Sequence, residues 1–381
     1  MRIPFNKIYI TGNEIENIKN AVDKGQICGD GCYTDAVMRK LCTDMEFKNI
    51  KLVTSGTHAL ELAALLAELE PGDEVIMPSF TFSSTANSVL LRGAKPVFAD
   101  IEIDTLNIDC CEVERKLSKK TKAIIPVHYG GVSCDMDKIM KIAADNSLII
   151  IEDAAQALYS KYKGKYLGGI GNFGCFSFHS TKNYTSGEGG AIVINSGSKE
   201  ILQRAEVIRQ KGTNRESFLN GEVDRYSWVG IGSSYSPADI LMAFLYEQLQ
   251  HHKYILESRQ TVHNRYSEGF EDLLGKGPLR GITKIPDYCQ SNYHIYYLLF
   301  DNSKVRSRFV QEMNKKEVSA YTHYTPLHNS KMGQDISSKP EELPVTEKVS
   351  EGLIRLPLYA DMTSDEVDYV INCVRNIMKV I

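Results

Sequence analysis

The hydrophobic and polar positions of the chain follow two alternating periods from residue 51 onward. Short apolar runs, rich in β-branched residues, alternate with stretches that have the helical spacing of apolar residues. Strands separated by helix-length crossovers form a parallel sheet with helices on both faces. The pattern therefore predicts a large α/β domain with three layers (αβα) and a mostly parallel sheet. The strand-like runs are KLVTSG (51–56), DEVIMPSFT (73–81), KPVFADI (95–101), AIIPVHYGG (123–131), LIIIEDAAQA (148–157), GCFSFH (174–179) and GGAIVIN (189–195).

The pattern changes in the last third of the chain. Residues 240–274 carry a long helical pattern without proline or an internal break, which predicts a bridge between two domains. Beyond it, short apolar runs and a charged helix predict a small α+β unit. The last helix begins after Thr363, which matches a capping box with Glu366 and precedes a regular apolar stripe. We expect a large domain over residues 1–247 and a small C-terminal domain over 248–381.

Composition narrows the class of protein. Of the 381 residues, 43% are hydrophobic and 24% are charged, as in ordinary globular domains. The net charge of −4, without a block of Lys or Arg, argues against nucleic acid as a partner, because neutralising phosphates needs concentrated positive charge. No signal peptide or spanning run of roughly 18 apolar residues is visible, so we expect a cytoplasmic protein with no membrane partner. The nine cysteines lack a CxxC pair and fit neither a disulfide framework nor a zinc ribbon.

One glycine motif is misleading. GIGNFG at residues 169–174 matches the dinucleotide-binding pattern GxGxxG, but a strand-like run follows it where a helix is required. No strand precedes it either, so we reject a dinucleotide site there. The patterns GxxxxGK[ST], HExxH and GxSxG do not occur, which removes P-loop, zincin and serine-hydrolase interpretations in their usual forms.

Two polar sites lie at the carboxyl ends of expected strands, the edge where open α/β sheets bind ligands. In LVTSGTHALELAA, the turn at residues 55–57 leads directly into a helix, whose unpaired N–H groups favour a phosphate. A simple turn with Thr57 as N-cap is the alternative. Asp153 emerges from the apolar run IIIED and needs a cationic or hydrogen-bonding partner. A pyridinium nitrogen would be such a partner, and a salt bridge or a helix cap is the alternative.

Lys182 lies in FSFHSTKNYTSGEGG (176–190), a turn of small residues between two apolar runs. A single lysine is most often a solvated surface charge. Together with a phosphate-binding turn and the strand-end carboxylate of Asp153, however, it matches the parts of a pyridoxal 5′-phosphate (PLP) site. In such a site the lysine forms the Schiff base, the aspartate keeps the pyridine nitrogen protonated and the helix end holds the phosphate.

An ordered set of motifs carries a resemblance over essentially the whole chain. SGTHALELAALL, GDEVIMPSFTF, IIPVHYGG, IEDAAQ, FSFHSTKNYTSGEGG, HYTPLH and RLPLY resemble the DegT-type family of PLP-dependent sugar-nucleotide aminotransferases. The resemblance implies the aspartate-aminotransferase fold (PLP fold type I). PFNKIYITGNE, ICGDGCYT and EVIRQKGTNR are most similar to members that use L-glutamate to aminate C4 of dTDP-4-dehydro-6-deoxy-D-glucose. Their products are 2-oxoglutarate and dTDP-4-amino-4,6-dideoxy-D-galactose, a precursor for lipopolysaccharide or other surface polysaccharides.

The resemblance also implies residue roles. Lys182 would be the catalytic residue that carries the Schiff base and relocates the proton during transamination. Since a free lysine has a pKa of about 10.4, desolvation has to help release it as a neutral amine. The expected cofactor contacts are Asp153 with the pyridine nitrogen, Gln156 with the ring hydroxyl, Phe80 stacked on the ring, and Gly56, Thr57 and Ser177 around the phosphate.

Members of the family are homodimers, and the resemblance implies the same for this chain. Many of them reach the phosphate across the dimer interface with an asparagine in a stretch like GYNYRMSD. This chain has GSSYSPAD there, so Ser234 makes the contact or the contact is absent. The family uses the HYTPLH region near the sugar, which makes His323 an expected substrate contact. Arg215 in KGTNR is an expected diphosphate contact, because a guanidinium binds phosphate oxygens bidentately, and a solvated loop is the alternative.

Other functions stay open at this stage. The same chemistry at C3, or on a UDP- or GDP-linked keto sugar, differs only in pocket details that spacing does not reveal. A regulatory protein that keeps the fold without catalysis is a further alternative, against which an intact Lys182 argues. Relatives that dehydrate 3-hydroxy sugars carry histidine at that position, so the lysine favours transamination. Four histidines (His128, His179, His323 and His328) lack a carboxylate at matching spacing, and we expect no metal site.

Overall fold

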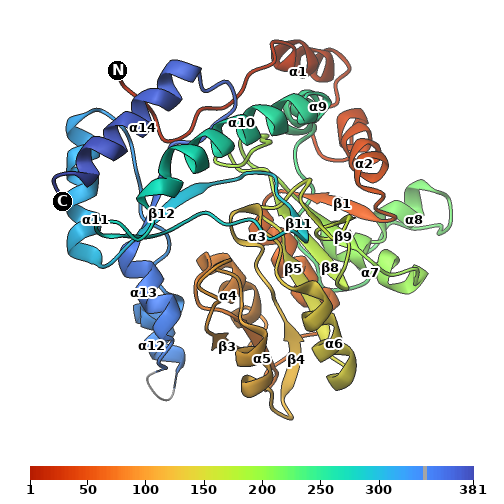
Figure 1. Cartoon of the computed structure of the whole chain (residues 1–381). Coiled ribbons are helices and arrows are strands. Elements are labelled where there is room, and N and C mark those ends of the chain that lie inside the picture. Colours follow the sequence, from red (N-terminus) through yellow and green to blue (C-terminus); the bar gives the residue numbers. More distant parts are fainter. Residues whose placement is uncertain (338–340) are drawn as a thin grey trace.

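A seven-stranded sheet organises the first half of the chain (Figure 1). The computed structural model of the protein describes residues 1–337 and 341–381. The strand order is β1-β9-β8-β5-β4-β2-β3, and β9 alone in this sheet runs antiparallel to its neighbours. The predicted, mostly parallel sheet is therefore confirmed. Its strands are β1 (Ile50–Val53), β2 (Glu74–Pro78), β3 (Lys95–Ala99), β4 (Thr121–Ile124), β5 (Ile149–Asp153), β8 (Phe173–Ser177) and β9 (Gly190–Ile194).

Helices cover both faces of this sheet, because the strands are apolar on both sides. Along β5, for example, Ile150 packs into the hydrophobic cluster of one face and Ile151 into that of the other. The predicted three-layer arrangement is thus confirmed. One face packs against α2 (Cys32–Met45), α5 (Cys110–Lys116), α6 (Met136–Asn146) and α9 (Asp239–Gln250), and the other against α3 (Gly56–Leu66), α4 (Ser83–Leu90) and α7 (Lys199–Arg209).

The last third forms a smaller unit around an antiparallel sheet of order β10-β12-β13. The expected final helix is α14, where the side chain of Thr363 accepts from the N–H of Glu366 and the Glu366 carboxylate accepts from the N–H of Thr363. This confirms the capping box, and the apolar stripe packs into the core of the unit. The elements are α10 (His252–Phe270), β10 (Leu279–Ile282), β12 (Tyr296–Phe300), α11 (Ser303–Lys315), α13 (Pro344–Gly352), β13 (Leu353–Leu356) and α14 (Ser364–Met378).

Short elements complete the chain. A three-stranded sheet pairs β6 with β7 and with β11, which comes from much later in the sequence. Within the two described ranges, no helix combines the length and the apolar composition needed to cross a bilayer. The remaining elements are α1 (Glu14–Asp23), β6 (Lys161–Tyr162), β7 (Lys165–Tyr166), α8 (Arg215–Leu219), β11 (Cys289–Gln290) and α12 (Lys331–Ile336).

Two features of the chain path differ from the expectation. The predicted unbroken helix over 240–274 is wrong, because α9 ends at Gln250 and α10 begins at His252. The break lets the apolar side chains of α9 face the core of the large sheet while the second half of α10 packs into the small unit. The first residues also leave the large domain: Ile3 pairs with Val318 and is buried in the small unit's core. Both termini accordingly lie beside α11 and α14 (Figure 1).

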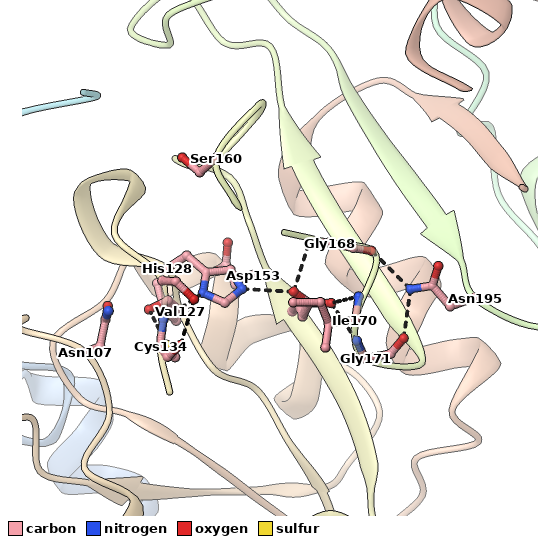
Figure 2. A network of polar contacts seen from close by, with 12 residues as sticks. Asn107, Val127, His128, Cys134, Asp153, Ser160, Gly168, Ile170, Gly171 and Asn195 are labelled. Carbon is pink, nitrogen blue, oxygen red and sulfur yellow. Dashed lines mark hydrogen bonds and ion pairs between the residues drawn. The ribbon is translucent and has the colours of Figure 1, made fainter. Parts of the chain in front are cut away.

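A buried carboxylate fixes the carboxyl end of β5. Glu152 is fully buried and accepts hydrogen bonds from the backbone N–H groups of Gly168 (2.8 Å), Ile170 (2.7 Å) and Gly171 (2.6 Å). His128 completes the shell with its Nε2, 3.0 Å from the carboxylate. Its Nδ1 accepts from the N–H of Cys134 (3.2 Å), so the ring proton is on Nε2 and is donated to Glu152. Figure 2 shows these donors converging from two loops.

This arrangement explains the GxGxxG-like stretch, which binds a carboxylate of the protein itself. Gly168 has a φ of +82°, and a Cβ there would lie 2.5 Å from the ring of Phe176. A Cβ on Gly171 would meet the side chain of Ile150 at 2.6 Å. Asn195 holds the turn from outside, donating to the carbonyls of Gly168 and Gly171 (Figure 2). The glycines are thus needed to bring backbone N–H groups close to a buried anion.

We expect Glu152→Gln to lower the free energy of unfolding by about 2–4 kcal/mol, because the amide places a donor where the buried N–H donors need an acceptor. Denaturant unfolding, followed by circular dichroism and tryptophan fluorescence, measures the change. The exposed Glu257→Gln on α10 is the matched control and should change stability by less than about 0.5 kcal/mol. Equal stability of the two variants would contradict this role for Glu152.

Candidate active site

A cavity of about 610 Å³ opens between the carboxyl ends of the large sheet's strands and the small unit. The small unit contributes β13 and the segment around residue 323, and the N-terminal segment contributes Phe5 and Asn6. The structure brings most of the predicted site residues together in this cavity. Those that line it are Gly56, Thr57, Asp153, Gln156, Ser177, Lys182 and His323.

The N-terminus of α3 forms one end of the cavity. Ser55 is the N-cap, and its Oγ accepts from the N–H of His58 (3.1 Å), so the alternative of Thr57 as N-cap is wrong. Gly56 is packed so closely that a Cβ would lie 2.7 Å from the Cβ of Ser177. Thr57 Oγ1 lies 2.8 Å from Ser84 Oγ at the start of α4. Free N–H groups of α3 and the hydroxyls of Thr57, Ser84 and Ser177 therefore lie at one end of the cavity. This arrangement favours a phosphate.

Asp153 points to the opposite face of the sheet from Glu152. It is 5% exposed and accepts from Thr85 Oγ1 (2.8 Å) and from the N–H of Ala155 (3.2 Å). Burial nevertheless raises the pKa of Asp153 above its usual value, although these donors and the charge of Lys182 act in the other direction. Among the residues that the structure describes, no ion pair involves Asp153, and a protonated ring nitrogen has the charge that would supply a cationic partner.

Lys182 lies in the turn after β8, where its backbone N–H donates to the carbonyl of His179 (2.8 Å). Desolvation lowers the pKa of its ammonium to about 8, opposed by the charge of Asp153 and assisted by that of Arg355. The side chain is therefore far easier to deprotonate than an ordinary lysine. A neutral amine is the form that reacts with a carbonyl compound.

The aromatic wall differs from the expectation. Phe80 is 1% exposed and packs with Tyr129 and Tyr324 in the cluster between the large sheet and the small unit, so it does not line the cavity. Phe82, two residues later, lines the cavity and is 59% exposed. Gln156 lines it as well, donating from Nε2 to the hydroxyl of Tyr324 (2.9 Å). Phe82 is therefore a flat and exposed side chain of the cavity that a ring could contact, whereas Phe80 is not.

Two further predicted residues lie outside the cavity of this chain. Ser234 is exposed, forms an isolated bridge with Gln210 and does not line the cavity. Arg215 begins α8, where its Nη1 lies 3.8 Å from Asp30. Arg215 therefore does not line the cavity of its own chain, and its diphosphate contact stays a prediction.

The four histidines do not gather. His128 is bonded to Glu152, and His328 Nδ1 lies 2.6 Å from the hydroxyl of Ser79. His323 lines the cavity, and burial, with the charges of Arg355 and Lys182, lowers its pKa well below the usual value. It is therefore a neutral imidazole beside the lysine. Within the described residues, no group of three or more His, Cys, Asp or Glu side chains is arranged to hold a metal ion.

Several residues of the site were missed by the sequence reasoning, namely Ser84, Thr85, Phe82, Tyr324 and Arg355; Thr85 donates to Asp153, and the other four line the cavity. The first three lie in SFTFSSTANS, whose hydroxyl-rich helix start is a signal for a polar helix N-terminus. Tyr324 follows His323 directly. Arg355 lies on β13 in RLPLY and has no local signal, because only the packing of the small unit on the large one brings it to the site.

The chain matches known proteins along its whole length. The model of the DegT/DnrJ/EryC1/StrS aminotransferase family matches residues 9–375. The spore coat polysaccharide biosynthesis protein SpsC of Bacillus subtilis is 32% identical, with 99% of this chain and 97% of that protein aligned. GDP-perosamine synthase of Escherichia coli O157:H7 is 28% identical over 97% of this chain and 96% of that enzyme.

The fold agrees with these matches. Spr1654 from Streptococcus pneumoniae, solved in its PLP form, superposes with a TM-score of 0.92 at 27% identity, covering 100% of this chain and 99% of that one. PLP is the cofactor of such enzymes, and the α3 N-terminus, Asp153 and Lys182 fit its phosphate, ring nitrogen and carbonyl. The chain belongs to the DegT/DnrJ/EryC1/StrS aminotransferase family of PLP-dependent sugar aminotransferases.

Proposed function

We propose that the protein transfers an amino group from L-glutamate to a nucleotide-linked keto sugar. The convergence of Lys182, Asp153 and the α3 N-terminus in one cavity carries this proposal. A regulatory protein without catalysis would not need a desolvated lysine whose pKa is lowered to about 8. The intact set of residues therefore supports catalysis.

Each residue has a separate task in this proposal. PLP, when bound, supplies the electron sink for the reaction. The α3 N-terminus, Thr57, Ser84 and Ser177 would hold its phosphate, and Asp153 would pair with its ring nitrogen. Phe82 would cover the ring in place of Phe80, and Gln156 would hold the ring hydroxyl.

Lys182 has two tasks, which both depend on its neutral form. Its amine would bind the cofactor covalently and, once displaced by the donor, would take the proton from the donor's Cα. The low pKa of Lys182 supports both, since an ammonium group can do neither. The neutral His323 and the buried tyrosines keep the surroundings of the amine free of competing acids.

The acceptor we propose is dTDP-4-dehydro-6-deoxy-D-glucose, giving dTDP-4-amino-4,6-dideoxy-D-galactose. Its support is the resemblance of PFNKIYITGNE, ICGDGCYT and EVIRQKGTNR to enzymes with that substrate. A GDP-linked keto sugar is the second candidate, because GDP-perosamine synthase aligns with almost the whole chain. UDP-linked sugars and amination at C3 remain outcomes of the same test.

We also propose a homodimer in which residues 218–231 cover the partner. This segment exposes an unusual number of large apolar side chains, led by Trp228 (79% exposed) and Ile231 (76%). Exposed apolar groups of this size commonly mark an interface. Ser234 lies three residues after the segment, and Arg215 begins α8, whose last two residues belong to the segment. A second copy could thus use both residues, which lie outside the cavity of their own chain.

The test follows the visible absorption of the bound PLP. Adding L-glutamate to the holoenzyme should bleach the band, and adding dTDP-4-dehydro-6-deoxy-D-glucose should restore it, because the two half-reactions interconvert two forms of the cofactor. In Lys182→Ala the rate of this absorption change should be at least about a thousandfold lower than in the wild type. Lys165→Ala, which removes an exposed lysine on β7, is the matched control.

The outcomes separate the candidates. Bleaching by glutamate with restoration only by a GDP- or UDP-linked keto sugar would keep the aminotransferase and replace the acceptor. A protein that never acquires the band would overturn the proposal altogether.

PLP uptake by the apoprotein should depend on pH through Lys182. The neutral amine attacks the aldehyde, so the rate should rise with pH through about 8 and then level off. In Asp153→Asn the midpoint should move to lower pH, because the carboxylate of Asp153 raises the pKa of Lys182. Stopped-flow absorbance measures both profiles. A midpoint near 10.5, the value of an ordinary lysine, would contradict the desolvation of this side chain.

The homodimer has its own test. Trp228→Glu should convert a dimer into a monomer in size-exclusion chromatography with light scattering, since a charge would be buried at the interface. Leu91→Glu changes another exposed apolar residue, 68% exposed at the end of α4, and should leave the dimer intact. A dimeric Trp228→Glu variant would place the interface elsewhere on the molecule. A monomeric wild type would rule out the homodimer.

A further inference from the structure

His294 lies two residues before β12 and lines the cavity that contains Lys182. Its Nδ1 lies 2.8 Å from the side-chain Oδ1 of Asn183, and the Nδ2 of Asn183 donates to the carbonyl of Asn292 (2.8 Å). The second bond fixes which end of the amide faces the ring, because only the NH₂ group can donate to a carbonyl. The ring proton of His294 is therefore on Nδ1 and is donated to Asn183.

The other ring nitrogen of His294 is a free hydrogen-bond acceptor. Burial, followed by the positive charge of Lys182, lowers the pKa of His294 well below its usual value, so the ring is neutral. A neutral imidazole with its proton on Nδ1 has a lone pair on Nε2. Among the described residues, no donor forms a hydrogen bond with this Nε2. The cavity thus contains an unused acceptor whose tautomer is set by the protein.

Hydrogen bonds hold the backbone that carries His294. Tyr293 has a φ of +54°, a conformation that is unfavourable for a bulky residue and persists only where the surrounding contacts enforce it. Arg259 on α10 supplies such contacts by donating to the carbonyls of Tyr293 and His294. Asn292 donates from Nδ2 to two carbonyls of the loop after β5 (2.9 and 3.0 Å). The position of the imidazole is therefore set from α10, from that loop and from the turn after β8.

A small void places His294 beside Lys182. This void, of about 10 Å³, is lined by both residues. The space is about enough for one water molecule, so groups on its walls lie within reach of a direct hydrogen bond or of one bridged by a single water. The other two histidines of the cavity, His179 and His323, do not border the void. His294 is thus the histidine of the cavity that is best placed to contact the Lys182 side chain.

We propose that His294 is a positioning residue for Lys182: its Nε2 accepts a hydrogen bond from the Lys182 side-chain nitrogen whenever this nitrogen is not bonded to PLP. The inference rests on the proposed function, in which the amino-acid donor displaces Lys182 from the cofactor. A lysine side chain is flexible, and a fixed acceptor keeps its nitrogen near the carbon whose proton it takes. The bond strengthens when Lys182 becomes an ammonium, because a charged donor binds an acceptor more tightly. The proton itself stays on Lys182.

The first test locates the ring proton of His294 in the apoprotein by NMR with ¹⁵N-labelled histidine. Two-bond ¹H–¹⁵N spectra distinguish the protonated ring nitrogen from the one with a lone pair, and His294→Gln assigns the signals by their loss. The proton should be on Nδ1. Lys182→Ala should move the Nε2 resonance, because it removes the donor. Lys165→Ala, which changes an exposed lysine on β7, is the matched control and should leave the resonance in place.

The second test compares the pH midpoint of PLP uptake, which reports the ionisation of Lys182. His294→Phe should lower the midpoint by about one pH unit, because loss of the acceptor disfavours the ammonium form. His294→Gln should stay near the wild type, since its amide oxygen can accept in place of Nε2. His251→Phe changes an imidazole outside the cavity and is the control. Asp153 and Arg355, whose charges act on Lys182 with opposite signs, are kept in all variants.

The outcomes distinguish this inference from the proposed function. A proton on Nε2, or an Nε2 resonance that does not respond to Lys182→Ala, would overturn the inference. Equal midpoints in His294→Phe and the wild type would overturn it as well. If dTDP-glucose moves the Nε2 resonance and Lys182→Ala does not, His294 contacts the sugar substrate and the inference is wrong. If both tests give the expected results in a protein that aminates no nucleotide-linked sugar, the contact with Lys182 stands and the proposed acceptor class fails.

Discussion

The active-site cavity depends on a buried anion that never enters it. Glu152 has no exposed surface, and a carboxylate in that position is tolerated only because three backbone N–H groups and His128 donate to it. The donors come from the loop after β4 and from the 168–171 turn before β8. Hydrogen bonds to one buried side chain therefore connect three neighbouring strands at the sheet edge where the cavity opens. These hydrogen bonds also fix the position of the next residue, Asp153.

The alternation of side chains along β5 places two adjacent carboxylates in different environments. Because successive side chains point to opposite faces, Glu152 and Asp153 lie back to back and meet different environments. The carboxylate of Glu152 is fully hydrogen-bonded. Asp153 accepts fewer hydrogen bonds, and burial raises its pKa. Across the cavity, desolvation lowers the pKa of Lys182 to about 8. The folded chain thus places the buried carboxylate of Asp153 and the easily deprotonated amine of Lys182 around a cavity that fits PLP.

Local patterns were sufficient to predict the sheet, its layers and the residues at its strand ends. Gly56, Asp153 and Lys182 were expected from the residues themselves, and Gln156 and Ser177 from the family resemblance. All five reach the cavity because each ends a strand or lies in the turn that follows one, so its place is set by a few neighbouring residues. Phe80 was misplaced because the chain turns after β2, and the orientation of the next side chains follows the turn and not the strand period. Arg355, the docking of Ile3 and the break before α10 depend on packing between distant segments, which a local pattern does not encode.

The division of the site between two units has a consequence for specificity. Lys182, Asp153 and the phosphate end of the cavity belong to the large sheet, whereas Arg355, His323 and Tyr324 belong to the smaller unit. The two units meet in an apolar cluster that contains Phe80 and Tyr129, and Tyr129 OH lies 3.0 Å from His323 Nδ1. The side chains that line the cavity are therefore contributed by different parts of the chain, so those of the smaller unit can vary while Lys182 and Asp153 stay in place.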